Sequence, residues 1–208
     1  MKKKYKKGLV LIIIVIIMVI VLIIAYKILK KDPVDNSIKV LDSIDNYSYS
    51  LDERDSTLMK NTYNELKKIL KEKEIDYEEY AKLLSKLFVI DLFTMSNKVN
   101  KYDVGSVEYV YPDAKENFQM NVLDTIYKQI ENNNGKRNQE LPVVKSVDII
   151  SIGTTTFMIN EKEYDAYEIN LSWTYEKNLG YDDHATINII KDNEQLYVVS
   201  YEVGDQDE

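Results

Sequence analysis

Residues 167–175 have the sequence Tyr-Glu-Ile-Asn-Leu-Ser-Trp-Thr-Tyr, and this stretch decides the class of the fold. Every second side chain is aromatic or aliphatic and those between are polar, so an extended strand here buries one face and exposes the other. The same two-residue period extends through most of the chain after Pro142, with polar turns at residues 160–163, 178–180 and 192–194. The second half of the chain therefore predicts antiparallel strands joined by short turns.

The residues before Pro142 follow a helical period instead. Between about residues 51 and 73, apolar side chains recur every three or four residues, which predicts a helix. Asp76 and Glu79 form a capping box that opens a second helix, at about residues 77–97. This helix is apolar on most sides, so we expect it to lie at the centre of the domain.

A third helix is expected after a short extended run at residues 107–111. Pro112 suits the first turn of a helix, where its missing N–H costs nothing, and the apolar stripe continues to about Glu131. Helices that precede a run of strands are typical of an α+β layer. The sequence thus predicts three helices packed on a curved antiparallel sheet of three to five strands.

Residues 9–25 form an unbroken apolar run. A helix of this length spans about 26 Å, close to the thickness of the hydrocarbon layer of a bilayer. We therefore expect a transmembrane helix at residues 8–27. A cleaved secretion signal would have a shorter apolar core followed by small residues, whereas this run ends in Ala25, Tyr26 and Lys27. A buried helix of a globular domain would have a polar face, and this run has none.

Lysines on both sides of the apolar run predict its orientation. Five lysines precede it and three follow it, a bias that favours an N-terminus in the cytoplasm. The expected localisation is the cell membrane, with a single span and the C-terminal domain outside. The expected segments are a basic cytoplasmic tail at residues 1–7, the transmembrane helix at 8–27, a stalk at 28–50, an extracytoplasmic α+β domain at 51–203 and an acidic tail at 204–208.

The charge of the chain is divided unevenly. The formal net charge is −8, but residues 1–31 contain eight lysines and no acidic residue. The rest of the chain keeps 19 of the 27 basic residues and all 35 acidic residues, a net charge of −16. Such a domain repels nucleic acid and favours basic protein surfaces or cations as partners. The absence of cysteine from the sequence excludes disulfides, thiolate metal sites and a cysteine nucleophile.

Asp91 lies in the apolar stripe of the second predicted helix, three residues after Phe88 and four before Met95. A buried carboxylate must be paired, hydrogen-bonded or protonated. One interpretation is a ligand-binding acid in a pocket, with a pKa raised by burial as a general base needs. The other is a structural acid bonded to a tyrosine, a tryptophan or a backbone group. The sequence leaves both open, and Asp91 is the single candidate ligand-binding residue.

Other groups of polar residues predict no metal site and no catalytic residue. Asp182, Asp183 and His184 are adjacent at the start of a strand, where successive side chains point in opposite directions and converge poorly on one ion. No Gly-x-Ser-x-Gly motif accompanies this single histidine, so a serine triad is not indicated. A further set lacks the spacing of a calcium loop: Asn97, Asn100, Asp103 and Glu108. We therefore expect no cofactor and no enzymatic activity.

The chain has seventeen tyrosines, a marked excess. Tyrosine offers a large contact area and a polar tip, so these residues could form a recognition surface. Core packing together with a biased composition explains the number equally well. The tyrosines in question are Tyr47, Tyr49, Tyr109, Tyr111, Tyr164, Tyr167, Tyr175 and Tyr181.

The expected order of elements in residues 52–203, helix-helix-strand-helix and then three strands, is similar to the nuclear transport factor 2-like (cystatin-like cone) fold. Together with the basic N-terminus and one span, it resembles the bitopic scaffold subunits of type IV secretion and conjugation machines. Residues 88–94, 107–113 and 172–175 also resemble membrane-anchored proteins of low-GC Gram-positive-type bacteria. The resemblance implies an outer domain that assembles with partners and catalyses nothing.

Two functions follow from these expectations. The first is a membrane-anchored extracytoplasmic protein-interaction domain, a scaffold in a cell-surface or transfer assembly, with the lipid bilayer and other proteins as its partners. The second is a small-ligand-binding or enzymatic cone-shaped domain with Asp91 in its pocket. An open, acid-lined, apolar cavity would favour the second function and a filled core the first.

Overall fold

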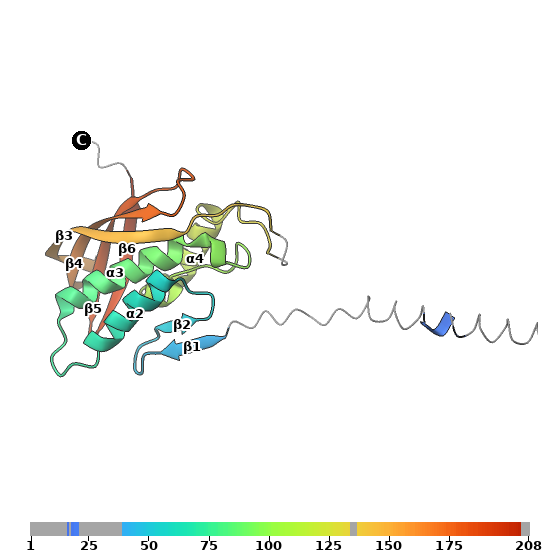
Figure 1. Ribbon diagram of the computed structural model, residues 1–208. Helices are drawn as coiled ribbons and strands as arrows, with labels where there is room; N and C mark the ends of the chain where they lie inside the picture. Colours follow the sequence, from blue (N-terminus) through green and yellow to red (C-terminus); the bar gives the residue numbers. More distant parts are fainter. Residues whose placement is uncertain (1–15, 17, 21–38, 134–136, 205–208) are drawn as a thin grey trace, which may run out of the picture. The chain divides into compact units, whose positions relative to one another are not determined.

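The computed structural model describes Ile16, residues 18–20, residues 39–133 and residues 137–204. The chain divides into two units, residues 1–38 and residues 39–208. All the labelled helices and strands belong to the second unit (Figure 1).

The predicted membrane span falls almost entirely outside the described residues. Of residues 8–27, only Ile16 and residues 18–20 are described, and these are helical. No helix within the described part of the chain is long and apolar enough to cross a membrane. The transmembrane helix therefore stays a prediction.

The second unit begins at Lys39, and this corrects the predicted stalk at residues 28–50. Strands β1 (Val40–Ser43) and β2 (Ser50–Asp52) form an antiparallel hairpin. Tyr49 is fully buried within the core, so the end of the predicted stalk is part of the folded domain.

Helix α2 (Thr57–Ile69) starts later than the predicted boundary at residue 51. The side chain of Ser56 accepts a hydrogen bond from the backbone N–H of Met59 and so caps the first turn. Instead of belonging to the helix, Leu51 and Asp52 pair in strand β2, and residues 53–55 connect this strand to Ser56.

The predicted central helix is present as α3 (Tyr77–Phe93). The Asp76 side chain accepts a hydrogen bond of 3.1 Å from the backbone N–H of Glu79, which confirms the predicted cap. The helix ends at Phe93, short of the predicted residue 97, because Met95 N–H donates to the carbonyl of Pro142 and draws the chain away. Most of the helix is buried.

The predicted short strand at residues 107–111 is wrong. Val107–Tyr109 form a 3₁₀ turn, and only Val110 makes a bridge, a parallel one to Val198. The left-handed backbone of Ser106, with φ at 65°, breaks the extended run that the alternating side chains suggest.

The third helix is shorter than predicted. A 3₁₀ turn at Pro112–Ala114 leads into α4 (Lys115–Asp124), which ends before the expected Glu131. The fully buried Tyr127 explains this end, because its hydroxyl donates a 2.8 Å hydrogen bond to the carbonyl of Leu92. A continued helix would not place that ring in the core.

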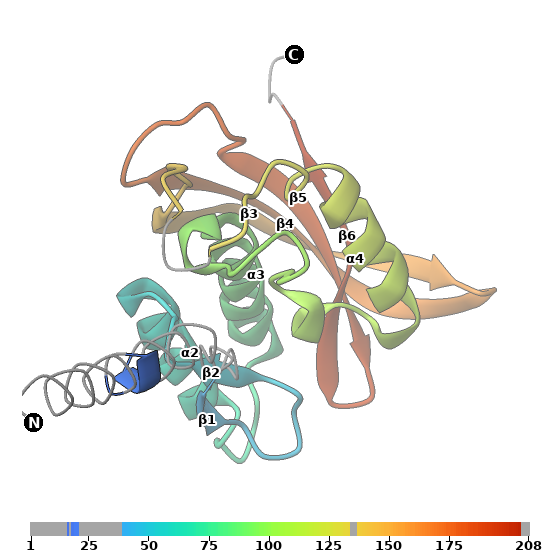
Figure 2. The same ribbon diagram turned by 90° about the vertical axis from the view of Figure 1, so that its right-hand side faces the viewer.

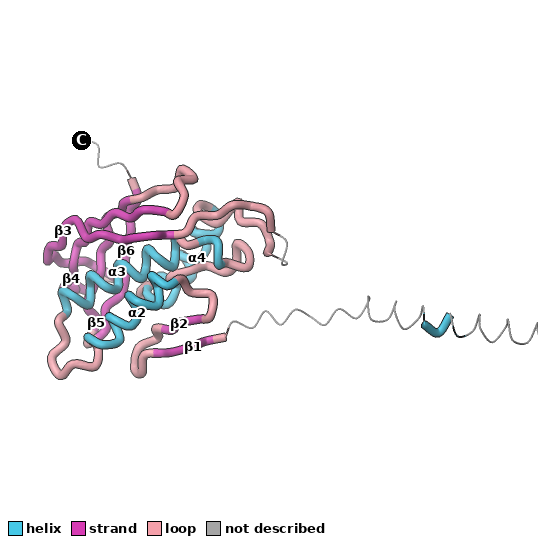
Figure 3. Tube along the Cα trace, viewed as in Figure 1, coloured by secondary structure: helices cyan, strands magenta, loops and turns pink. Residues whose placement is uncertain are grey.

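The predicted meander is confirmed. Four antiparallel strands pair in the order β3-β4-β5-β6 (Figure 3). Their bounds are β3 Val144–Ile159, β4 Lys162–Tyr175, β5 His184–Asp192 and β6 Gln195–Val203. Helices and a four-stranded antiparallel sheet make the domain α+β, as the sequence predicts.

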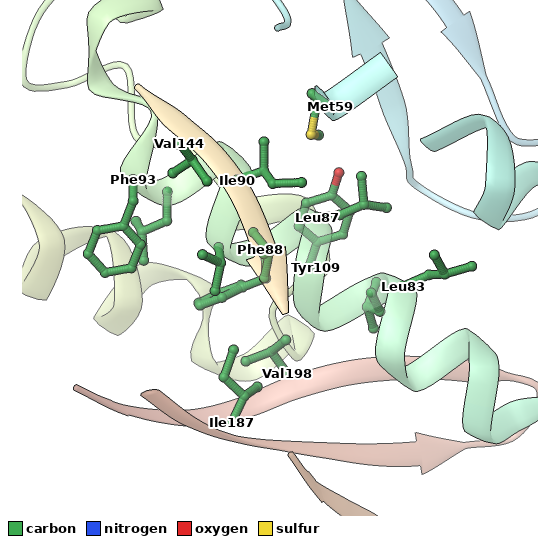
Figure 4. Packing of buried hydrophobic residues seen from close by; sticks show 14 of the residues in the cluster. Met59, Leu83, Leu87, Phe88, Ile90, Phe93, Tyr109, Val144, Ile187 and Val198 are labelled. Atoms are coloured by element: carbon green, nitrogen blue, oxygen red, sulfur yellow. The ribbon is translucent and has the colours of Figure 1, made fainter. Parts of the chain in front are cut away.

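Helix α3 packs across the sheet and contacts each of its four strands. Figure 4 shows Phe88 of this helix near Ile187 and Val198 of the sheet. The ring of Phe93 lies 4.7 Å from that of Trp173. These contacts bury one face of the sheet and account for the apolar positions of residues 167–175.

The opposite face of the sheet has two different halves. Polar side chains bond to one another in one half, where Asn170 donates to Ser151 at 2.9 Å and accepts from Thr186 at 2.6 Å. In the other half, Tyr164, Ala166 and Ile190 form a separate small apolar cluster, against which Tyr111, Phe157, Ile159, Tyr197 and Val199 pack. The small cluster lies opposite the main core because Ala166 and Ile190 alternate with Tyr167 and Ile189 along their strands.

Candidate functional site

Asp91 on α3 has two internal partners. Its carboxylate forms an ion pair with Lys98, at 2.5 Å between Oδ1 and Nζ, and accepts a hydrogen bond from the backbone N–H of Ser106. The side chains of Asp91 and Lys98 are only 16% and 6% exposed. Burial alone would lower the pKa of Lys98, but the charge of Asp91 raises it above the ordinary value. The ammonium group therefore stays charged.

The loop after α3 is shaped to reach Asp91. A Cβ atom on Gly105 would lie 2.5 Å from the backbone oxygen of Asp91, so only glycine fits there. Ser106 has a positive φ, and its hydroxyl donates to the carbonyl of Phe88 at 2.6 Å. This arrangement matches the interpretation of Asp91 as a structural acid, with Lys98 as a partner that the sequence did not indicate.

The residues considered as a calcium group also have internal partners. Arg54 donates to Asp103 at 2.5 Å and to the carbonyl of Asn97 at 3.2 Å. Although burial opposes it, the hydrogen bond from Arg54 lowers the pKa of Asp103. Asn100 accepts from the backbone N–H of Tyr102. In residues 39–133 and 137–204 no group of acidic and histidine residues could hold a metal ion.

Glu108 and Asp55 are buried acids near this network. Burial raises the pKa of Glu108 to about 7, even though the backbone N–H and the hydroxyl of Ser50 donate to its carboxylate. Burial likewise raises the pKa of Asp55 to about 6, and its carboxylate accepts from the backbone N–H of Asp52. These contacts tie strand β2 to the loop after α3.

The domain has a groove of about 640 Å³. Three loops form it: the β1–β2 turn, the α2–α3 loop and the β5–β6 turn. We call it the acidic groove. Its lining residues are Asp45, Asn46, Tyr47, Leu70, Glu72, Lys73, Ile75, Tyr77, Asp192, Asn193, Glu194, Gln195 and Tyr197.

Negative charge dominates the acidic groove. Four carboxylates line it against a single lysine, Lys73. Asp192 lies 3.7 Å from Lys162, but Asp45, Glu72 and Glu194 have no ion pair with any described residue. Carboxylates without internal partners are available to a positively charged ligand.

Tyrosine rings build the walls of the acidic groove. Tyr47, Tyr77 and Tyr197 line it and are half-buried. Tyr47 stacks on the buried Tyr49, with ring centroids 5.7 Å apart. The hydroxyl of Tyr49 in turn donates to the carbonyl of Leu196 at 2.9 Å and bonds the hydroxyl of Tyr80. The core thus fixes the walls of the groove in place.

One cation already lies on this aromatic surface. The Lys191 ammonium is 3.4 Å from the centroid of the Tyr77 ring. A cation over a tyrosine face is attracted by the negative charge density of the ring. The groove therefore combines carboxylates and aromatic faces, which both favour ammonium and guanidinium groups.

A second pocket, of about 470 Å³, lies at the β4–β5 loop and includes Trp173, Tyr175 and Tyr181. His184 Nδ1 is 2.8 Å from Asp183, while Asp182 uses its backbone carbonyl to accept from Tyr175. The side chains of Asp183 and His184 therefore contact each other, although the alternation along a strand predicts that adjacent side chains diverge. A third pocket, of about 290 Å³, lies between α4 and β6.

Asp91 lines none of these three pockets. Tyr47 was among the candidate recognition residues in the sequence, whereas Tyr77 and Tyr197 were not, and residues 192–194 were expected only as a turn. The one signal for the acidic groove in the sequence was the presence of acidic residues in two separate turns. Nothing in the sequence showed that these turns meet.

Comparison of this chain with protein-family models, with curated proteins and with solved structures finds no match.

Proposed function

We propose that this chain is a single-pass membrane protein whose folded domain binds other proteins outside the cytoplasm, with the acidic groove as the binding surface. The apolar run at residues 9–25 supports the anchor, since it has the length and composition of a membrane span. The observation that carries the binding proposal is the set of unpaired carboxylates in a groove walled by tyrosines.

The partner that fits this groove is a protein segment rich in lysine or arginine. Its cations would neutralise Asp45, Glu72 and Glu194, and its aliphatic stems would lie on the rings of Tyr47 and Tyr197. Exposed ion pairs are individually weak. Anchoring to a membrane raises the effective concentration of the domain, so weak contacts suffice.

We also propose that the domain is a variant of the nuclear transport factor 2-like fold. Helices that precede a curved antiparallel sheet, with α3 lying across that sheet, support this assignment. The variant begins with the β1–β2 hairpin and has a 3₁₀ turn at Val107–Tyr109 in place of the short strand. The assignment adds weight to a scaffold role, because the resembled secretion subunits assemble with partners.

The membrane part of the proposal is tested by fractionation and by protease treatment of cells stripped of their wall. We expect the full-length chain in the membrane fraction and a domain that external protease removes. Recovery of the full chain in the soluble fraction, or a domain that protease leaves intact in sealed cells, would contradict the anchor and its orientation.

The binding part is tested by site-specific photo-crosslinking in the same cells. A photoreactive residue at Glu194 lies in the acidic groove, and one at Glu168 lies exposed on strand β4, away from it. We expect adducts with other proteins at position 194 and few at position 168. Equal yields at the two positions, or no adduct at position 194, would contradict the groove as the binding surface.

A further inference from the structure

The two edges of the four-stranded sheet differ in how far residues outside the sheet cover them. At the β6 edge, Val110 bridges Val198, and the backbone N–H of Tyr111 donates to the Val198 carbonyl at 3.0 Å. At the β3 edge, the first residue of the strand is also covered, because the backbone N–H of Val144 donates to the side chain of Thr94. Beyond that point, no described residue outside the sheet bonds to the β3 backbone.

Strand β3 is also unevenly protected along its length. The pairing with β4 shifts between Val144 and Ser146 and again between Ile149 and Ser151, which marks two bulges. Bulges bend an edge strand and discourage further pairing. From Ser151 to Ile159 the register is regular over nine residues. This regular part belongs to the hairpin that extends away from the helices in Figure 2.

Residues 149–160 contain no charged residue, in a chain of which 30% is charged. They contain no proline either, so neither charge nor proline protects this part of the edge. The segment is also rich in threonine and isoleucine, which favour strands. Gly153 and Thr154–Thr156 are exposed, and Met158 is 58% exposed. Such an edge is suited to receive another strand.

We propose that residues 151–159 of β3 pair with the same residues of a second copy of this chain. The pairing is antiparallel about a two-fold axis at Thr155, so the two four-stranded sheets join into one of eight strands. Charge selects this partner. Two copies that each have a net charge of −16 after residue 31 repel one another, and the uncharged residues 151–159 can pair without placing like charges opposite each other.

The side chains of this segment complement one another in that register. Two-fold symmetry places Phe157 opposite Gly153, where an aromatic ring covers the missing side chain of an edge glycine. On the other face it places Ile152 opposite Met158, an apolar pair. The two copies of Thr155 meet at the axis, and Thr154 lies opposite Thr156, pairs that are favourable between strands.

Cysteine crosslinking tests the register, because the natural chain has no cysteine. The full-length chain, purified in detergent micelles, would carry Thr155→Cys and be oxidised. We expect a disulfide-linked dimer on a non-reducing gel. The matched control is Glu168→Cys. Glu168 pairs with Gly153 but lies on β4, one strand further from the edge, so we expect this variant to form no disulfide and to run as a single chain on the gel.

Antiparallel pairing makes a second, sharper prediction. Ser151→Cys should form a mixed disulfide with Ile159→Cys when the two proteins are combined. Ser151→Cys alone should not crosslink, since its two copies would lie about 26 Å apart. Crosslinking of Ser151→Cys to itself would overturn the antiparallel register.

A charge at the axis tests the interface without any crosslink. Thr155→Lys places two ammonium groups opposite each other and should change the mass in solution from two chains per micelle to one. Thr174→Lys changes an equally exposed threonine on the inner strand β4 and should leave two. A wild-type monomer at micromolar concentration, a dimer that survives Thr155→Lys, or a Thr155→Cys chain that stays unlinked after oxidation would each overturn the proposal.

Discussion

The charged groups around Asp91 and those of the acidic groove are built from the same residue types but differ in their partners. Inside, Asp91 has Lys98 and Ser106, and Asp103 has Arg54. In the groove, Glu72 and Glu194 are exposed and have no described ion pair. A charged side chain whose partner lies within the fold has a structural role, whereas an exposed charged side chain without such a partner is available for binding.

The largest effect is expected from removing a buried partner. Lys98→Met leaves the Asp91 carboxylate buried without its cation, which costs about 3–5 kcal/mol of unfolding free energy. Denaturant unfolding of the full-length chain, followed by the fluorescence of Trp173, measures this. Trp173 is the only tryptophan and packs on Phe93 in the core.

The matched control for this first change is the double variant Asp91→Leu/Lys98→Met. It removes both charges and should recover most of the lost stability, because no isolated charge remains. If Lys98→Met alone unfolded at the wild-type denaturant concentration, the structural role of the ion pair would be refuted.

Glu108 should have a smaller effect on the unfolding free energy, and this effect depends on pH. Its pKa is raised from 4.5 to about 7, so between these values the folded domain holds a proton that the unfolded chain releases. Stability therefore falls as pH rises through this range, by on the order of 2 kcal/mol. Glu108→Gln should flatten this part of a stability–pH curve and stabilise the domain at pH 8.

Glu116→Gln on the exposed face of α4 is the control for the pH experiment. It should leave the pH dependence of unfolding unchanged. A Glu108→Gln curve that follows the wild-type curve from pH 4.5 to 7 would show that Glu108 is not the titrating group.

Substitutions in the acidic groove should change the affinity for a basic peptide rather than the unfolding free energy. Asp45→Asn/Glu194→Gln removes two unpaired charges and should weaken binding of a fluorescent oligolysine peptide about fivefold, near 1 kcal/mol in total. Fluorescence polarisation at low salt measures the affinity, which should fall further as salt is added. The control is Glu161→Gln/Glu163→Gln, which changes exposed residues of the β3–β4 turn and of the start of β4, and an equal loss there would point to non-specific attraction.

The smallest effect is expected from an exposed ion pair. Lys82 and Glu78 lie one turn apart on α3, at 2.6 Å, and Glu78 is largely exposed. Glu78→Gln should lower the unfolding free energy by less than about 0.5 kcal/mol. A loss comparable to that of Lys98→Met would contradict the distinction between buried and exposed charges.

Much of the fold could be predicted because its signals are local. The Asp76 cap, the apolar stripe of α3 and the alternation after Pro142 each depend on neighbouring residues. The errors arose where distant contacts override such signals. Tyr127 ends α4 early by bonding the carbonyl of Leu92, and Tyr49 draws the end of the expected stalk into the core.

The candidate site was less predictable than the fold. The position of Asp91 in an apolar stripe correctly indicated a buried acid, but Lys98 reaches it only because the chain turns after Phe93. The acidic groove needs the turns at residues 45–47 and 192–195 to meet beside Tyr77. These segments are far apart in the chain, and no sequence period relates them.

The sequence alone determined the α+β class, the position of the helices before the four-stranded sheet and the negative charge of the domain, since periodicity and composition are properties of the chain itself. Tertiary structure decided which charges are paired, which tyrosines wall a groove and which sheet edge stays uncovered. Those properties depend on contacts between residues distant in sequence, and only the folded packing of the helices, loops and sheet brings such residues together.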